Sequence, residues 1–540
     1  MPLLLSSRVP RLVLLVVAIL TARIAATEPK TSSARNYDVV IYGATASGVA
    51  MAITVAREGG KVALLEPTKH VGGMVTGGLS RTDFGNQDCI GGLAREFYKE
   101  LGKRYGQLIE WYPEPHVAEQ VLNTMLKEAH VSVFLQHRLL ENDGVTTAAG
   151  RITSIKMENG VVFTAQVFAD CTYEGDLMAK AGVSYTFGRE GRDHYGESLA
   201  GVREKTPKHQ FKVKVKARDE NGKLLPEIQA GSKGVPGAAD NKVQAYNFRL
   251  CMTGEARNSV PFPKPPDYSP DRYKLLLRLI EATIDEKGTT PTVKDLIHPG
   301  PIQKHKTDTN NNGAFSTDYI GGSWNYPDAS YAQREQIWQE HFNYVAGFMY
   351  FLANDDRIPA ELRDELTTWG LAADEFPETG HWPRQLYVRE ARRMVGEYVM
   401  SQRDIQTSLT KPDVIGMGSY NSDSHNVQRI ENASGFAANE GDMQVGVKPY
   451  QIPYRMITPK RGEAANLLVP VCFSASHVAY STLRMEPQYM IIGQAAGVAA
   501  VLANRNNCAV QDVDTAALSG RLRQLKAVME LQETAAPDVP

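Results

Sequence analysis

Residues 37–66 constrain the fold more than any other part of this chain. They carry, in order, the patterns of a buried strand, a glycine-containing turn, a helix and a second strand. These four segments are 37–42 (YDVVIY), 43–48 (GATASG), 49–58 and 61–65 (KVALL). A strand, turn, helix and strand in this order predict a βαβ unit with two parallel strands, and therefore an α/β fold.

The turn and the end of the second strand have the chemistry of a dinucleotide site. A helix that starts at the turn offers free N–H groups to a pyrophosphate, and Glu66 lies 18 residues after Gly48, where an acid accepts from ribose hydroxyls. Thr45 stands where the usual pattern has its middle glycine. The candidate cofactor-binding residues of this unit are Gly43, Ala44, Thr45, Ser47, Gly48 and Glu66.

A second glycine-rich stretch, HVGGMVTGGL (70–79), leaves backbone exposed for close approach by a flat ring or a phosphate. Together, residues 37–85 resemble the N-terminal signature of FAD-dependent oxidoreductases of the glutathione reductase and fumarate reductase superfamily. More narrowly, they are similar to the group that includes heterodisulfide reductase A-like proteins, in which a turn without the middle glycine is common. The resemblance implies FAD as cofactor and adds Gly72, Gly73, Met74 and Gly78 to its binding residues.

Two later segments strengthen the resemblance. Residues 150–169 alternate around a turn at 158–160 and predict a hairpin, which leads into DCTYEGD (170–176). Residues 466–470 predict a strand, and a small-residue helix follows over 493–500. In the family these segments lie beside FAD, and a helix end there faces the flavin pyrimidine. The resemblance therefore implies Asp170, Asp176, Gly493 and Gly497 as further cofactor-binding residues.

The predicted fold is a Rossmann-like FAD-binding domain with a discontinuous parallel sheet, joined to a mixed α+β substrate lobe. The expected boundaries are a signal peptide (1–26), a linker (27–36), the FAD-binding domain in two parts (37–185 and 441–510), a substrate lobe (186–440) and a C-terminal tail (511–540). Within the lobe we expect an antiparallel element at 211–216, a polar loop at 305–312, and helices at 272–286 and 333–352.

Polar clusters in the substrate lobe and near the C-terminus supply the candidate catalytic residues. Arginine can hold an anionic or hydroxylated substrate, and histidine can move a proton during hydride transfer. The candidates are His425, His477, Arg389 and Arg484. Arg389, Arg392 and Arg393 recur at helical spacing, and we interpret the last two as solvated or ion-paired. His305 and His381 are single loop histidines, which are usually ordinary surface residues.

The N-terminus predicts export. Arg8 and Arg11 precede the apolar run 12–20, and small residues follow at Ala22, Ala25 and Ala26, which is the layout of a signal peptide. An uncleaved membrane anchor is the alternative. The five cysteines show no C-x-x-C spacing, so iron–sulfur and zinc motifs are not expected, and no metal-ligand spacing such as H-E-x-x-H occurs.

The leading hypothesis is an exported, periplasmic or secreted FAD-dependent oxidoreductase that moves a hydride between flavin N5 and a small polar, carbohydrate-like substrate. With 59 basic and 61 acidic residues, the chain has no charge excess that indicates a nucleic-acid partner. The alternatives are a polysaccharide lyase-like protein with a structural FAD, and a non-enzymatic exported binding protein. The substrate and the electron acceptor stay open.

Overall fold

The computed structural model describes residues 34–407 and 409–531. The predicted signal peptide and most of the predicted linker lie outside the described residues. Residues 34–531 belong to one compact unit, so the predicted lobes share one continuous body.

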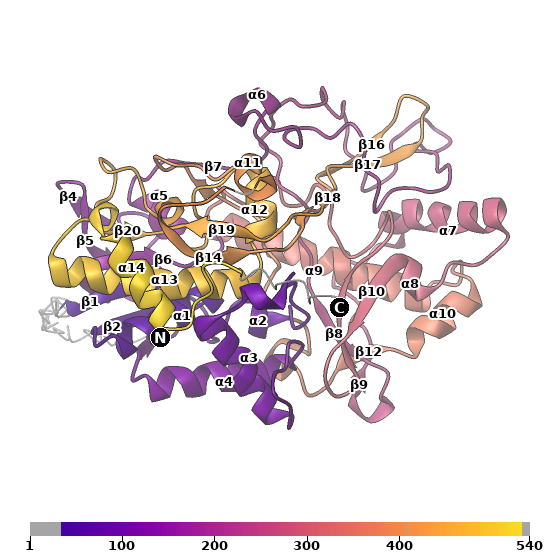
Figure 1. Cartoon of the computed structure of the whole chain (residues 1–540). Helices are drawn as coiled ribbons and strands as arrows, with labels where there is room; N and C mark the ends of the chain where they lie inside the picture. Colours follow the sequence, from indigo (N-terminus) through magenta and orange to yellow (C-terminus); the bar gives the residue numbers. More distant parts are fainter. Residues whose placement is uncertain (1–33, 408, 532–540) are drawn as a thin grey trace, which may run out of the picture. The chain divides into compact units, whose positions relative to one another are not determined.

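A seven-stranded sheet forms the part predicted to bind the cofactor (Figure 1). Strand β1 is central and runs parallel to β2 and β6, β2 is parallel to β3, and the late strand β20 is parallel to β6. Antiparallel β5 and β4 extend the sheet beyond β6. The strands are β1 (Arg35–Tyr42), β2 (Val62–Leu65), β3 (Ser132–Phe134), β4 (Val145–Ala148), β5 (Arg151–Lys156), β6 (Val162–Asp170) and β20 (Leu467–Leu468). This sheet confirms the predicted α/β class.

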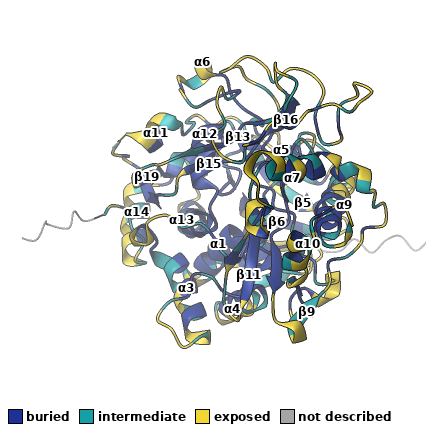
Figure 2. Ribbon diagram, turned by 90° about the vertical axis from the view of Figure 1, so that its right-hand side faces the viewer, coloured by how far each residue is buried: buried dark blue, intermediate teal, exposed yellow. Residues whose placement is uncertain are grey.

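Helices α1 (Ala46–Arg57) and α13 (Glu486–Asn506) pack together against this sheet and are buried, dark blue in Figure 2. Helix α13 brings a C-terminal segment onto the N-terminal βαβ unit, which makes this part of the fold discontinuous in sequence. The surrounding elements are α2 (Met74–Gly77), α3 (Gly92–Arg104), α4 (Pro115–Glu128), α5 (Asp176–Lys180), α12 (His477–Leu483) and α14 (Thr515–Gln524). The segment expected as a tail thus includes α14, which packs on α13.

The middle of the chain forms a second, five-stranded sheet in the order β10-β11-β8-β12-β9, accompanied by helices. Its elements are β8 (Leu250–Thr253), β9 (Ser259–Val260), β10 (Ile297–Pro301), β11 (Lys306–Asn311), β12 (Gly370–Ala372), α7 (Lys274–Lys287), α8 (Val293–Leu296), α9 (Tyr331–Asn354) and α10 (Ala360–Thr367). The helices expected at 272–286 and 333–352 are present as α7 and α9.

Short pairs of strands complete the described residues, with two small helices. They are β7 (Tyr185–Thr186) with β13 (Arg393–Met394), β14 (Val414–Gly418) with β19 (Tyr450–Pro453), β15 (Ser422–Ser424) with β18 (Met443–Val445), β16 (Gln428–Glu431) with β17 (Ala437–Glu440), and the helices α6 (Arg192–Tyr195) and α11 (Gln402–Gln406).

One local prediction holds in reduced form and two were wrong. Residues 211–216 alternate between buried and exposed as expected, but their antiparallel pairing is a single bridge, between Lys216 and Phe436, instead of a strand ladder. The polar run expected as a loop at 305–312 is largely strand β11, which pairs on both sides and is buried. Residues 387–393 form no helix: Tyr387 bridges to Asn247, and Arg393 lies in strand β13.

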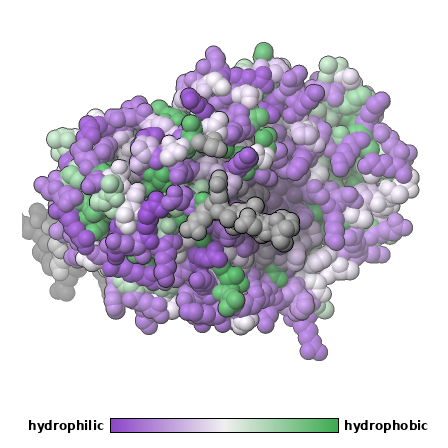
Figure 3. Space-filling view, viewed as in Figure 1, coloured by the Kyte–Doolittle hydropathy of each residue, from purple (hydrophilic) through white to green (hydrophobic). Residues whose placement is uncertain are grey.

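The face shown in Figure 3 is mainly hydrophilic, with apolar side chains in small separate patches. Among the described residues, no helix combines the length and the apolar character needed to cross a membrane.

Candidate functional site

A cavity of about 600 Å³ opens at the carboxyl ends of β1, β2 and β6, the edge at which open α/β sheets bind their ligands. The glycine turn after β1 and the acid after β2 both reach it. Its lining includes Gly43, Thr45, Glu66, Gly73 and Asp176 from the predicted cofactor residues.

The turn between β1 and α1 permits no larger residues at its two glycines. Gly43 has φ +98°, and a Cβ atom there would lie 2.8 Å from the backbone of Cys171. A Cβ on Gly48 would lie 1.9 Å from the carbonyl oxygen of Gly43. Thr45, in place of the usual middle glycine, caps α1 by accepting from Gly48 N–H (3.4 Å), and it donates to the carbonyl of Cys171 (2.7 Å). Threonine therefore fixes this turn to the end of β6.

Glu66 is buried at the end of β2. Its Oε2 accepts from the N–H of Ala44 (2.8 Å) and its Oε1 from the N–H of Thr68 (2.9 Å). Burial raises the pKa of Glu66, and the two N–H donors oppose that rise. The carboxylate thus lies between the turn and the cavity, in position to accept from hydroxyl groups of a ligand.

The second glycine-rich stretch forms the next part of the cavity wall. Tyr173 crosses it: the N–H of Met74 donates to the Tyr173 hydroxyl (2.9 Å), and a Cβ on Gly73 would lie 2.5 Å from that oxygen. The hydroxyl itself donates to Glu486 at the start of α13 (2.9 Å). Gly78, with φ +144°, packs against the main-chain carbonyl of Arg249, the residue that directly precedes β8.

Asp170 and Asp176 have different surroundings. Asp170 is fully buried and accepts from Thr172 and from the N–H of Met178, so it holds the turn after β6, and burial raises its pKa to about 6. Asp176 lines the cavity and pairs with Arg334 (2.7 Å) and Arg392 (2.8 Å). Burial works against its charge, but these two arginines outweigh it and lower the pKa of Asp176.

Gly493 and Gly497 lie where α13 crosses α1. A Cβ on Gly493 would be 2.2 Å from the carbonyl oxygen of Ser47, and one on Gly497 would be 2.8 Å from that of Met51. Ser47, another predicted cofactor residue, is fully buried in the same contact. The structure therefore gives both glycines a helix-packing role that holds α1 in place.

A second buried polar cluster lies beyond Gly78. His425 directly follows β15, and its Nδ1 lies 2.7 Å from Oδ2 of Asp318. Asp318 also pairs with Arg389 (3.0 Å). Burial opposes the charge of Asp318, yet Arg389 and His425 lower its pKa to about 2, while burial and Arg389 lower the pKa of His425 to about 4. At neutral pH an ionised Asp318 therefore accepts from Nδ1–H, and Nε2 of His425 carries a free lone pair.

Tyr387 lies among three guanidinium groups in this cluster. The Cζ atoms of Arg389, Arg249 and Arg484 are 4.8, 5.9 and 5.9 Å from the centre of its ring. Arg484 donates to the Tyr387 hydroxyl (3.0 Å) and to the carbonyl of Asp423 (2.7 Å). The structure thus brings three predicted catalytic residues, His425, Arg389 and Arg484, into one cluster.

The fourth predicted catalytic residue, His477, lies in a different network. Its Nδ1 is 2.8 Å from Glu390, its N–H donates to Glu190 (2.9 Å), and Arg393 pairs with both glutamates. Burial and Arg393 lower the pKa of His477 to about 3. Arg393 is therefore ion-paired, as expected, but buried, and His477 holds α12 within that network.

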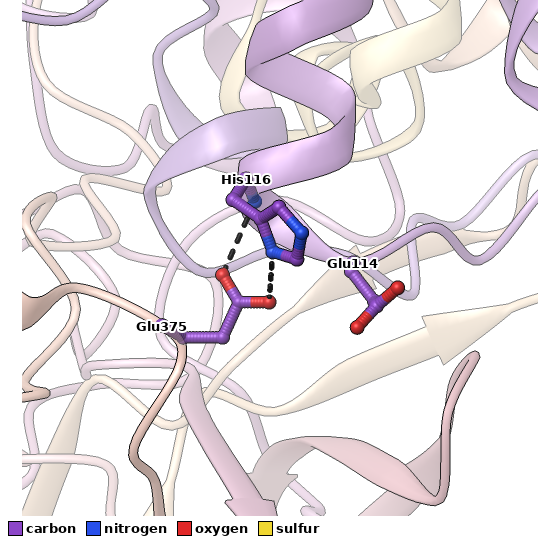
Figure 4. A group of neighbouring side chains, drawn as sticks. All are labelled: Glu114, His116 and Glu375. Carbon is purple, nitrogen blue, oxygen red and sulfur yellow. Dashed lines mark hydrogen bonds and ion pairs between the residues drawn. The ribbon is translucent and has the colours of Figure 1, made fainter. Parts of the chain in front are cut away.

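Glu114, His116 and Glu375 form a cluster with metal-ligand chemistry (Figure 4). The ammonium of Lys306 already occupies its cation position, 2.6 Å from Glu114 and 2.8 Å from Glu375. Burial opposes that charge, but the carboxylates, with Glu375 first, outweigh it and raise the pKa of Lys306. We assign this cluster as a buried ion network.

Sequence comparison supplies the family. A family model described as "FAD dependent oxidoreductase" matches residues 38–522. The chain belongs to this family. No curated protein sequence matches the chain. The finer assignment to a heterodisulfide reductase A-like group stays a prediction.

Three solved structures illustrate the similarity of part of this FAD-dependent oxidoreductase to known proteins. OxyS anhydrotetracycline hydroxylase from Streptomyces rimosus is 14% identical over 32% of this chain and 41% of its own, with a TM-score of 0.21. A flavoprotein/dehydrogenase from Cytophaga hutchinsonii is 16% identical over 28% of this chain and 42% of its own, with a TM-score of 0.21. An L-amino acid deaminase from Proteus vulgaris is 16% identical over 30% of this chain and 53% of its own, with a TM-score of 0.21. The chain spans less than two thirds of each of these proteins.

FAD is the cofactor of this oxidoreductase, and the cavity fits it. Gly43 and Thr45 of the turn line the cavity beside the N-terminus of α1, whose free N–H groups can bind a pyrophosphate, and Glu66 has the chemistry for a ribose. Sequence reasoning missed several residues that complete the site, because they come from separate elements without a shared motif. They are Arg138 and Arg334 in the cavity wall, and Asp83, Arg249 and Asp318 in the second polar cluster.

Proposed function

We propose that this FAD-dependent oxidoreductase is exported and transfers a hydride between a small polar, carbohydrate-like substrate and its flavin. Segments 37–185 and 441–510 hold the cofactor in this proposal, and 186–440 covers it and selects the substrate. Export is supported by Arg8, Arg11 and the apolar run 12–20, which precede the described residues.

The observation that carries the redox proposal is the Asp318–His425 pair beside Arg484. Asp318 holds Nδ1 of His425, which leaves Nε2 free to accept the proton of a substrate hydroxyl. Asp318 keeps its negative charge next to the imidazolium that this proton transfer creates. Bound FAD supplies the hydride acceptor at N5.

Contacts along the chain connect this pair to the cofactor cavity. Gly77 lines the cavity, Gly78 packs on the backbone of Arg249, and the Arg249 guanidinium lies 5.9 Å from the ring of Tyr387. Arg484, bonded to Tyr387, is two residues before Glu486, which begins α13 and contacts Tyr173 in the cavity wall. In this proposal the cluster of His425, Asp318 and Arg484 acts from the side of the cavity wall that Gly77 and Tyr173 form.

The test is the visible spectrum of the FAD-loaded protein during anaerobic addition of sugars, polyols and other polar metabolites. The proposal predicts that the oxidised-flavin band bleaches with at least one sugar or polyol. An unchanged band in the presence of every compound, while one of them is converted without redox change, would show lyase-like chemistry and contradict the proposal.

A further inference from the structure

Arg484 and Asp423 face each other in the catalytic cluster without forming a close ion pair. Their nearest charged atoms, Nη2 of Arg484 and Oδ2 of Asp423, are 3.9 Å apart. Nη2 donates instead to the main-chain carbonyl of Asp423. The Nε of Arg484 and the Oδ1 of Asp423 are both buried and have no hydrogen-bond partner within the described residues.

A buried guanidinium Nε–H and a buried carboxylate oxygen without partners are costly, because each atom has lost water without a replacement. The side chain of Arg484 is 2% exposed and that of Asp423 14%. The Nε–H donor and the Oδ1 acceptor are therefore the two unsatisfied polar atoms of this contact, and a ligand that reached them would supply both missing hydrogen bonds.

Nε2 of His425 adds a second acceptor. It lies 3.9 Å from Oδ1 of Asp423, too far for a hydrogen bond between them but near enough for two neighbouring groups of one ligand to reach both atoms. The ligand must then offer two donors side by side, and at least one acceptor for Arg484.

Hydroxyl groups meet this requirement, because each one donates one hydrogen bond and accepts others. A carboxylate only accepts, and it would face the acids Asp423 and Asp83. An ammonium only donates, and it would face Arg484 and Arg249 while leaving Nε unpaired. Charge does not favour an anion either, since Arg249 and Arg389 already pair with Asp308 (2.7 Å) and Asp318 (3.0 Å).

We propose that Arg484 and Asp423 recognise a vicinal diol of a neutral sugar or polyol. One hydroxyl donates to Nε2 of His425, and its neighbour donates to Oδ1 of Asp423 and accepts from Nε of Arg484. This inference rests on the proposed function and narrows its substrate class to neutral polyhydroxyl compounds.

Equilibrium binding to the oxidised holoenzyme tests the proposal without turnover. The probes are four neutral compounds with their matching acids and amines. Binding of each probe is measured by the change in the flavin spectrum and by calorimetry. The neutral compounds are D-glucose, D-galactose, D-mannose and D-glucitol; the acids are D-glucuronate, D-galacturonate, D-mannuronate and D-gluconate; the amines are D-glucosamine, D-galactosamine, D-mannosamine and D-glucamine. We expect at least one neutral compound to bind tenfold or more tightly than its acid and its amine.

Two variants probe the recognition point separately. Asp423→Asn removes the carboxylate, and Arg484→Lys keeps the charge but removes the Nε–H. Each is expected to weaken binding of the neutral ligand tenfold or more while FAD content stays that of the wild type. Glu340→Gln, in a separate polar groove of about 830 Å³, is the matched control and should bind the ligand normally.

Tighter binding of an acid or amine, no binding of any neutral probe, or unaltered binding by both site variants would overturn the proposal. Binding and redox failures are distinguishable. A neutral sugar that binds through Arg484 and Asp423 but never bleaches the flavin supports the recognition site and contradicts hydride transfer. Bleaching of the flavin by an acidic sugar alone supports hydride transfer and contradicts the recognition site for neutral diols.

Discussion

Asp318 determines which ring nitrogen of His425 carries the proton. Because its carboxylate accepts from Nδ1–H, the other nitrogen of the imidazole is the one free to act as a base. Arg389, a predicted catalytic residue, pairs with Asp318 and does not need to touch substrate to act. In the proposed mechanism Arg389 is therefore a positioning residue for His425.

Replacing Asp318 by Asn should slow anaerobic flavin reduction by about 10²–10⁴-fold, the usual contribution of a general base. An amide can donate to Nδ1, which favours the tautomer with its proton on Nε2. The measurement is stopped-flow reduction with the compound that bleaches the wild-type flavin, with the exposed His194→Asn as control. A wild-type rate in Asp318→Asn, with FAD bound, would exclude His425 as the base.

Helices α1 and α13 form the most extensive contact between any two helices or strands of the described residues. They join residues more than 400 positions apart, and their approach depends on glycine at Gly493 and Gly497. The N-terminus of α1, which contributes the cofactor turn, is held at this crossing. Packing of two distant helices thereby positions the cofactor site.

Gly493→Ala should lower the free energy of unfolding by about 1–3 kcal/mol, because its Cβ would lie 2.2 Å from the carbonyl oxygen of Ser47. Gly520→Ala in α14 is the matched control: nothing lies within 4 Å of its Cβ, so alanine should be neutral or add up to about 1 kcal/mol. Thermal unfolding of both variants checks this. Equal melting temperatures would show that the crossing tolerates a methyl group.

The sequence predicted the βαβ unit well, because residues 37–66 combine local patterns that all favour the same structure. It also predicted His425 and Arg484 as candidate catalytic residues, although not that the two side chains lie in one cluster. Strand β11 was missed because its letters, KTDTNN, are polar. Its side chains are buried only through pairing with β8 and β10, which no local pattern reveals. Asp318 and Arg249 were missed for a similar reason: only tertiary contacts bring them to the site.

Buried histidines make the stability of the whole molecule depend on pH. Burial lowers the pKa of His341 from 6.5 to about 4, whereas the unfolded chain titrates it normally. Between these values the unfolded state binds the extra proton, so the free energy of unfolding falls as pH falls from 6.5 through 4. One such group contributes up to about 1.4 kcal/mol per pH unit in this window.

His341→Gln should therefore reduce the pH dependence of stability between pH 6.5 and 4 by close to one proton. Glutamine can still bond the carbonyl of Ile337, which the imidazole contacts at 2.7 Å. Buried acids such as Asp170 and Glu486, whose pKa values are raised to about 6 and about 8, act in the opposite direction but are the same in both proteins. Denaturant unfolding at several pH values measures the difference, and identical slopes would contradict a neutral buried His341.

The cavity after β1, β2 and β6 is the site that we expect to bind FAD as a redox cofactor. The most direct test is to titrate the purified chain with FAD and follow its visible absorbance, then add a chemical reductant under anaerobic conditions. We expect saturation at one FAD per chain and a bound flavin that bleaches reversibly. A colourless protein that takes up no added FAD would contradict it.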